Sequence, residues 1–141
     1  MRQPRSESQP IDYQNVTLSN ANNIRVTFHA RSPRHLSVNG NLFQFEYDVY
    51  ETVVYGEYVF VLLDVPSECN SFITNIYGLR GGKQLWQVEE RSIRFPGKGW
   101  LPFVGMNVTD DGRLIGVDFC GRRAIIDIAT GAIIGHATSV K

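Results

Sequence analysis

Three histidines and two cysteines could ligate a metal or act as nucleophile and base in this chain. The fold would have to gather His29, His35 and His136 to form a metal site. Cys120 precedes Gly121 in a pattern typical of a tight turn, where a small residue is needed in any case. No phosphate-binding loop, nucleophile elbow or zinc-protease motif occurs. We therefore predict no catalytic, metal or cofactor site and no enzyme.

Two pairs of adjacent acidic residues are candidates for binding a partner: Glu89 with Glu90, and Asp110 with Asp111. Neighbours on a strand point to opposite faces, which is poor geometry for a general acid and base acting together. A calcium loop needs more oxygen ligands at closer spacing than Asp110 and Asp111 provide. Both aspartates precede Gly112 and are typical turn residues, but exposed carboxylates there could also imitate phosphates and engage a basic surface.

The longest segment without a strand pattern covers residues 91–103 and contains several prolines and glycines. It carries Arg94, Phe95 and Trp100, and arginine and aromatic side chains are frequent anchors of protein interfaces. Loops held by a rigid sheet often carry recognition, so this segment is a candidate contact loop. The alternative is that Phe95 and Trp100 fold back to cover an open end of the sheet.

Two stretches share one plan, in which a short apolar strand, a glycine turn and a second apolar strand follow each other. They cover residues 76–88 and 125–137. This order is typical of a β-hairpin. Trp86 and Val88 share one face of the first hairpin, and we expect both in the core.

Alternating apolar and polar residues predict further strands at residues 24–28 and 43–49. In the second of these, Phe43, Phe45, Tyr47 and Val49 share one face, which we expect to be buried. Asn39-Gly40 predicts a tight turn that pairs residues 36–38 with the strand starting at Leu42.

Residues 58–63 have no polar face and predict an interior strand covered on both sides. Strands resume at residues 103–108 and 113–119. About ten short strands result, and no helical period of useful length appears. We therefore predict an all-β antiparallel meander, either a partial propeller or an open twisted sheet or sandwich.

The composition favours one all-β domain over residues 13–141, preceded by a flexible polar tail over residues 1–12. Fourteen basic residues balance fourteen acidic ones, so the basic surface of a nucleic-acid binder is missing. No apolar run approaches a membrane span or a secretory signal, and two cysteines make no disulfide scaffold. We expect a cytoplasmic protein without nucleic-acid or membrane partners.

The sequence GKQLW over residues 82–86, a glycine turn followed by a strand with tryptophan, resembles blades of quinoprotein-type β-propellers. Such blades have about 40–45 residues and closed rings usually need at least four, so this chain has room for roughly three. The resemblance therefore implies a partial propeller without a quinone cofactor.

A wider resemblance rests on four segments in order: LLDVP (62–66), NIYGL (75–79), GKQLWQVE (82–89) and DFCGRRAIIDIATG (118–131). This order is similar to that of small bacterial proteins, several of them immunity proteins against toxins of contact-dependent growth inhibition and related systems. The resemblance implies an antitoxin that covers the active site of a cognate toxin, often a nuclease. It assigns no individual binding residue.

Three function classes remain open. The first is the immunity protein, with Glu89, Glu90, Arg94, Phe95, Trp100, Asp110 and Asp111 as candidate contacts. The second is a small-molecule binder in which Phe43, Phe45 and Tyr58 line a pocket in a small barrel. The third is an enzyme, which would need His29, His35 and a carboxylate in one cleft. Unpaired sheet edges could also extend across a two-fold axis, so a homodimer is a further candidate.

Overall fold

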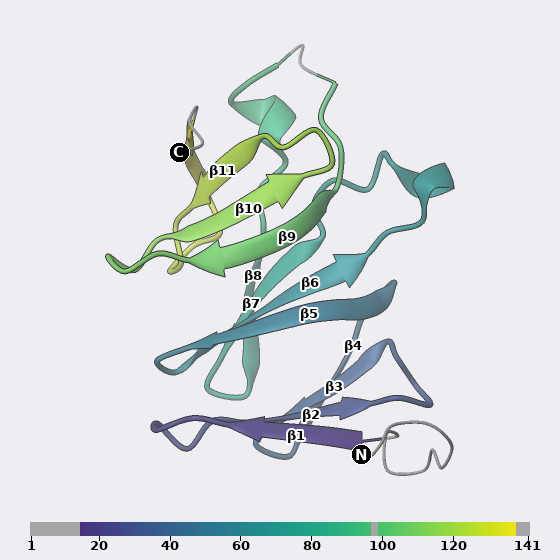
Figure 1. Ribbon diagram of the computed structural model, residues 1–141, viewed down its shortest axis with the longest axis vertical. Coiled ribbons are helices and arrows are strands. Elements are labelled where there is room, and N and C mark those ends of the chain that lie inside the picture. Colours follow the sequence, from purple (N-terminus) through teal and green to yellow (C-terminus); the bar gives the residue numbers. More distant parts are fainter. Residues whose placement is uncertain (1–14, 97–98, 138–141) are drawn as a thin grey trace. The chain divides into compact units, whose positions relative to one another are not determined.

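The computed structural model describes residues 15–96 and 99–137, so the predicted tail over residues 1–12 lies outside the described residues. The chain divides into two compact units, one ending at Val49 and one beginning at Tyr50, and each is described by itself. The single domain over residues 13–141 therefore stays a prediction. The all-β class is confirmed: the described residues form three open antiparallel sheets of four strands (Figure 1).

The first sheet belongs to the first unit and joins its strands in sequence order. Its strands are β1 (Asn15–Ser19), β2 (Arg25–His29), β3 (His35–Val38) and β4 (Asn41–Gln44). Positive φ angles at Asn39 (49°) and Gly40 (86°) confirm the predicted tight turn between β3 and β4. Val26 and Leu36 are fully buried and form the core of this unit.

The predicted continuous strand over residues 43–49 is wrong. β4 ends at Gln44 and β5 begins at Asp48, and these two strands belong to different sheets. Between them, the Phe45 N–H donates to the carbonyl of Arg34, and the Val49 N–H donates to that of Pro33. The backbone thus bonds to a turn, although the side chains alternate as they would in a strand. Phe45 is buried, whereas Phe43, Tyr47 and Val49 are half-buried.

The second sheet also joins its strands in sequence order. It contains β5 (Asp48–Tyr55), β6 (Tyr58–Asp64), β7 (Ile76–Arg80) and β8 (Lys83–Gln87), with the 3-10 helix η2 (Ser67–Cys69) between β6 and β7. Residues 59–63 of β6 are at most 1% exposed, which confirms the strand covered on both faces. The first predicted hairpin is β7–β8, turned by Gly81 and Gly82 at φ angles of 61° and 79°.

The third sheet has the order β12–β11–β10–β9. It contains β9 (Phe103–Val108), β10 (Leu114–Asp118), β11 (Arg123–Ile126) and β12 (Ile133–Ala137), and the 3-10 helix η3 (Arg91–Ile93) precedes it. The predicted turns at Gly112 and Gly121 have φ angles of 85° and 81°. The second predicted hairpin is β11–β12.

In the second unit, the second and third sheets pack on each other through one hydrophobic cluster (Figure 1). Trp86, 6% exposed, lies at this joint and stacks on Phe60 with ring centroids 5.9 Å apart. Its Nε1 donates to the carbonyl of Ile128 at 2.8 Å, so the indole links β8 to the loop between β11 and β12. The predicted core positions of Trp86 and Val88 are confirmed.

Asn75 makes a second link between these sheets. Its side chain is fully buried, and Nδ2 donates to the carbonyls of Leu63 and Phe103 at 2.9 and 2.8 Å. Oδ1 accepts the Phe103 N–H at 2.9 Å. The amide is therefore well satisfied, and it holds the end of β6 against the start of β9.

Gly78→Ala should destabilise the protein by about 1–3 kcal/mol, because a methyl group there would lie 2.3 Å from the indole of Trp86. Gly105→Ala is the matched control, since nothing lies within 4 Å of its added methyl and its φ is not positive. It should change stability by less than about 1 kcal/mol. Urea unfolding of both variants measures this, and equal losses would contradict the assigned position of Trp86.

Candidate functional site

A buried ion pair holds the base of the segment over residues 91–103. Arg91 and Asp118 both have fully buried side chains, and Nη1 of the arginine lies 3.1 Å from Oδ2 of the aspartate. Nη2 of Arg91 donates to the carbonyl of Leu101. Burial lowers the pKa of the Arg91 guanidinium, and the charge and hydrogen bond of Asp118 oppose that effect. The pair fixes both ends of the segment to the end of β10.

Trp100 lies against two guanidinium groups in the same place. The Cζ atoms of Arg91 and Arg122 lie 4.5 and 4.6 Å from its ring centroid. Arg122 also donates to Asp118 at 2.9 Å and to the carbonyl of Gly99 at 3.2 Å. The indole Nε1 of Trp100 donates to the carbonyl of Phe95 at 2.8 Å. The segment is therefore an ordered part of the second unit where the structure describes it.

His136 completes the cluster from β12. Its ring stacks on Trp100 at 4.9 Å and meets Phe95 edge-on at 4.5 Å. Phe95 and Trp100 are thus folded back onto the third sheet, which is the second of the two arrangements that the sequence left open. Burial, followed by the nearby charge of Arg91, lowers the pKa of His136. Its buried Nε2 has no hydrogen-bond partner among the described residues.

Glu89 and Arg94 are used mainly inside the molecule. Oε1 of Glu89 accepts from Arg94 at 2.8 Å and from the N–H of Ile133 at 3.0 Å, so it joins the segment to β12. The hydrogen bond from Arg94, and then that from Ile133, lower the pKa of Glu89. Glu90 is exposed and accepts the hydroxyl of Ser92 at 2.5 Å.

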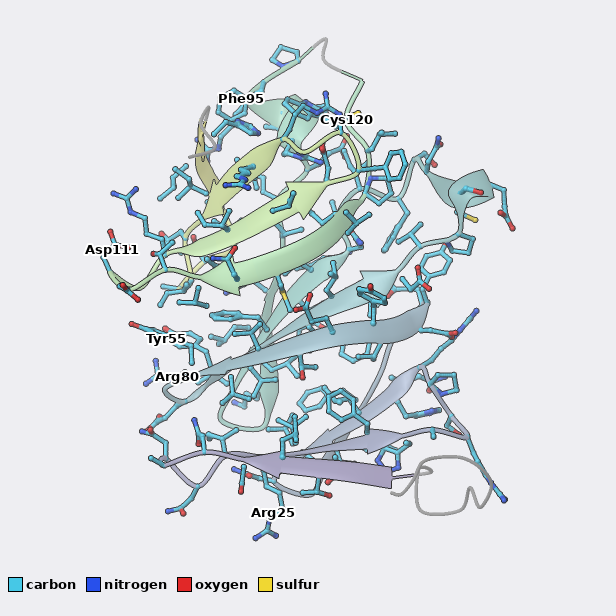
Figure 2. The ribbon with its side chains drawn as sticks, in the orientation of Figure 1. Arg25, Tyr55, Arg80, Phe95, Asp111 and Cys120 are labelled. Carbon is cyan, nitrogen blue, oxygen red and sulfur yellow. The ribbon has the colours of Figure 1, made fainter. Side chains whose placement is uncertain are left out.

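Asp110 and Asp111 are exposed on the turn between β9 and β10. The Asp111 carboxylate accepts a hydrogen bond from the Thr109 hydroxyl, and this bond lowers the pKa of Asp111. Its Oδ2 lies 3.5 Å from Nε of Arg113. Figure 2 shows Asp111, on the turn before β10, far from Phe95 and from Cys120, which follows β10. The predicted contact residues are therefore not one cluster: Phe95 and Trp100 lie against His136, Glu89 lies at the start of β12, and Asp110 and Asp111 lie on a separate turn.

A shallow apolar groove, which we call the Phe119 groove, lies at the Cys120 end of β10 and encloses about 240 Å³. Two proline-containing segments and two strand ends form it. Its lining residues are Val65, Pro66, Ser67, Asn70, Leu101, Pro102, Val104 and Phe119. Phe119 is 80% exposed and Val104 is 48% exposed, so the apolar surface faces solvent.

A second hollow of about 190 Å³ continues the Phe119 groove, because both are lined by Val65, Pro102 and Val104. It extends the apolar surface to Tyr50, which is 63% exposed. Asp64 lines this hollow and is exposed, so the apolar surface has an acidic border.

Sequence reasoning missed the Phe119 groove, although one signal was present. Phe119 stands directly before the Cys120-Gly121 turn, where a polar residue is the usual choice. It was expected to end a strand, whereas β10 ends at Asp118. Only the folded chain brings Pro66 and Pro102 beside it.

The described residues contain no group of three or more histidine, cysteine, aspartate or glutamate side chains arranged to hold a metal ion. His29 bonds to the hydroxyl of Ser37 at 2.9 Å within the first sheet. Across residues 15–96 and 99–137, no helix has the length and apolar character needed to cross a membrane.

The stability of the protein should fall as the pH drops through the ordinary range of histidine, at about 6.5, because the unfolded chain protonates His136 more readily than the folded protein does. Above that range both states hold a neutral imidazole, and His136 contributes no slope. His136→Phe keeps an aromatic ring beside Trp100 without a titrating group. Urea unfolding at a series of pH values should show a smaller loss of unfolding free energy below about pH 6.5 for this variant than for the parent protein. An equal loss in both proteins would contradict the prediction.

Comparison with known proteins gave a family match. The family model described as Domain of unknown function (DUF7957) matches residues 24–137 and so spans all three sheets except β1. No curated protein and no solved structure matches the chain. On the match over residues 24–137, the chain belongs to the DUF7957 family.

Proposed function

We propose that this protein is a cytoplasmic immunity protein, which binds a cognate bacterial toxin and covers its active site, and that the Phe119 groove is its contact surface. The toxin is expected to be a nuclease. The observation that carries the proposal is the 80% exposed phenylalanine at the mouth of an apolar groove on a well-packed unit.

The filled interior of the second unit supports a binding protein over a small-molecule carrier. Phe60, Leu62 and Ile76 are fully buried in the cluster between the second and third sheets. Pockets for small molecules usually enclose about 300–1,000 Å³ and surround most of the ligand. The Phe119 groove, with about 240 Å³, and the hollow that continues it are shallow and open to solvent, so they would not surround a ligand. They suit a side chain of a partner protein better than a whole ligand.

The chemistry of the groove is that of an interface centre. Phenylalanine is enriched in the cores of protein interfaces, and a few large aromatic anchors supply most of the binding free energy. Phe119, Val104 and Tyr50 expose apolar surface on one continuous part of the unit. Pro66 and Pro102 limit the freedom of the backbone on both sides, so little entropy is lost on binding.

Acidic side chains beside the groove support a basic partner. Asp64 lines the adjoining hollow, and Glu68 lies in η2 between the groove residues Ser67 and Asn70. Both carboxylates belong to exposed residues. A nuclease has a basic surface where it binds the phosphate backbone of its nucleic-acid substrate. The acidic border would therefore speed the encounter with such a toxin and help to orient it.

The groove changes which of the residues proposed from the sequence we expect to contact the toxin. Phe95, Trp100, Glu89 and Arg94 support the segment that supplies Leu101 and Pro102 to the groove, and we assign them a positioning role. Glu90 stays a candidate contact. Asp110 and Asp111 lie at the far end of β10, so we place them outside the proposed contact surface.

Co-expression with the C-terminal domain of whatever large secreted protein is encoded directly upstream tests the proposal. The expected result is cell survival together with a one-to-one complex on size exclusion. Phe119→Asp should weaken the complex by about 30-fold or more, because loss of an aromatic anchor costs about 2 kcal/mol or more. Leu42→Asp, on a residue that is 62% exposed in the first unit, is the matched control and should bind normally.

A harmless neighbour, or a toxin that kills regardless and never co-elutes, would overturn the immunity role. Rescue that survives Phe119→Asp but fails with Leu42→Asp would overturn the assigned surface. Binding of a small molecule by the free protein, lost in Phe119→Asp, would favour the small-molecule class instead.

A further inference from the structure

Two apolar hollows of the second unit lie next to each other and share one wall. The Phe119 groove and the hollow that continues it have Val65, Pro102 and Val104 in common. An exposed aromatic ring stands on either side of these shared residues, because Phe119 lines only the first of the two hollows and Tyr50 only the second. The surface therefore offers two neighbouring apolar places in a row, and no single deep pocket.

Polar groups without a partner in the chain border the same row. Ser67 and Asn70 line the first hollow and are exposed, and their side chains make no hydrogen bond within the part of the chain that the structure describes. Among the same residues, the Tyr50 hydroxyl beside the second hollow has no partner either.

These polar groups favour an extended occupant over a helical one. An extended peptide has backbone N–H and C=O groups without internal partners, and hydroxyl and amide side chains on a binding surface can bond to them. A helix satisfies its own backbone, so it would cover Ser67 and Asn70 without pairing them, which is costly.

The charge beside the row is acidic. Of the described residues that line the two hollows, Asp64 alone is charged, and its carboxylate forms no ion pair within the described ranges. Glu68 in η2 is exposed and likewise has no described partner. Arg122 follows β10, but Asp118 and the carbonyl of Gly99 hold its guanidinium. A lysine or arginine of the occupant would therefore complement the Asp64 side of the row.

We propose that the two hollows hold one extended segment of the partner protein, with an apolar side chain in each hollow and a lysine or arginine beside Asp64. This inference rests on the contact surface assigned under the proposed function, and it names what the toxin inserts there. Proline suits such a segment, because a polyproline II strand is extended before it binds and docks in grooves lined by aromatic rings. Its side chains repeat every three residues along about 9 Å, so two anchors three residues apart enter neighbouring hollows.

Fluorescence anisotropy of short labelled peptides with the purified full chain tests this inference. The first peptide carries two leucines three residues apart, proline spacers and a lysine at each end, so that either chain direction is served. The second has glutamate in place of both lysines. The third has the same leucines and lysines at helical spacing in an alanine-rich sequence. The first should bind tightest, and the second should bind at least about threefold more weakly because a favourable rim charge becomes a repulsive one.

Variants of the protein locate the peptide. Phe119→Asp and Tyr50→Ala should each weaken the proline peptide by about tenfold or more, because each removes an aromatic contact. Asp64→Lys combined with Glu68→Lys should reverse the preference, so that the glutamate peptide binds tighter than the lysine peptide. A merely destabilised surface would not give this reversal.

Asp110→Lys combined with Asp111→Lys is the matched control for the charge. It makes the same change in net charge on an exposed turn outside the contact surface, and the preference for lysine should remain. Circular dichroism checks that every variant folds.

Three results would overturn the inference. They are a helical peptide that binds as tightly as the proline peptide, no binding by any peptide up to about 1 mM, and a preference for lysine that survives the double change at Asp64 and Glu68. Toxin rescue that depends on Phe119 without any peptide binding would reject the extended segment and leave the proposed function standing. Peptide binding as expected without toxin rescue would support the segment and reject the immunity role.

Discussion

The ion pair between Arg91 and Asp118 determines how the second unit presents its surface. Taking two charges out of water is costly, and the hydrogen bonds to Asp118 offset part of that cost, while the buried Nε of Arg91 has no hydrogen-bond partner among the described residues. Asp118 accepts from Arg91, from the side chain and N–H of Arg122, and from the N–H of Cys120. Its carboxylate therefore organises the turn after β10 and the segment that precedes β9. The Phe119 groove exists because these two pieces of chain are held next to each other.

The parts of the fold that depend on neighbours in the sequence could be predicted from the sequence. The glycine pair after Arg80 requires a tight turn, so the β7–β8 hairpin follows from local backbone preference. The apolar run in β6 predicts burial on both faces because no register of that strand exposes a polar side. Trp86 was assigned to the core because it shares one face of its hairpin with Val88.

Features that depend on distant partners could not be predicted. The break between β4 and β5 is hidden by side-chain alternation, and only the hydrogen bonds to Pro33 and Arg34 mark it. The candidate site was predicted in part. The sequence pointed to residues 91–103 and offered the folding back of Phe95 and Trp100 as one of two arrangements, but it could not identify His136, far along the chain, as the residue they pack on. Phe119 became a candidate only when Pro66 and Pro102 were found beside it.

The sequential order of strands within every sheet has a consequence for how the chain acquires its structure. Each sheet is made from one continuous stretch, and each strand pairs with its immediate predecessor or successor. Such local pairing has low contact order, so each sheet can form quickly and as a cooperative unit of its own. During synthesis the first sheet can pair before the second has been translated. The Arg91–Asp118 pair joins residues 27 positions apart and must wait for the end of β10, so the surface that we assign to partner binding is completed late.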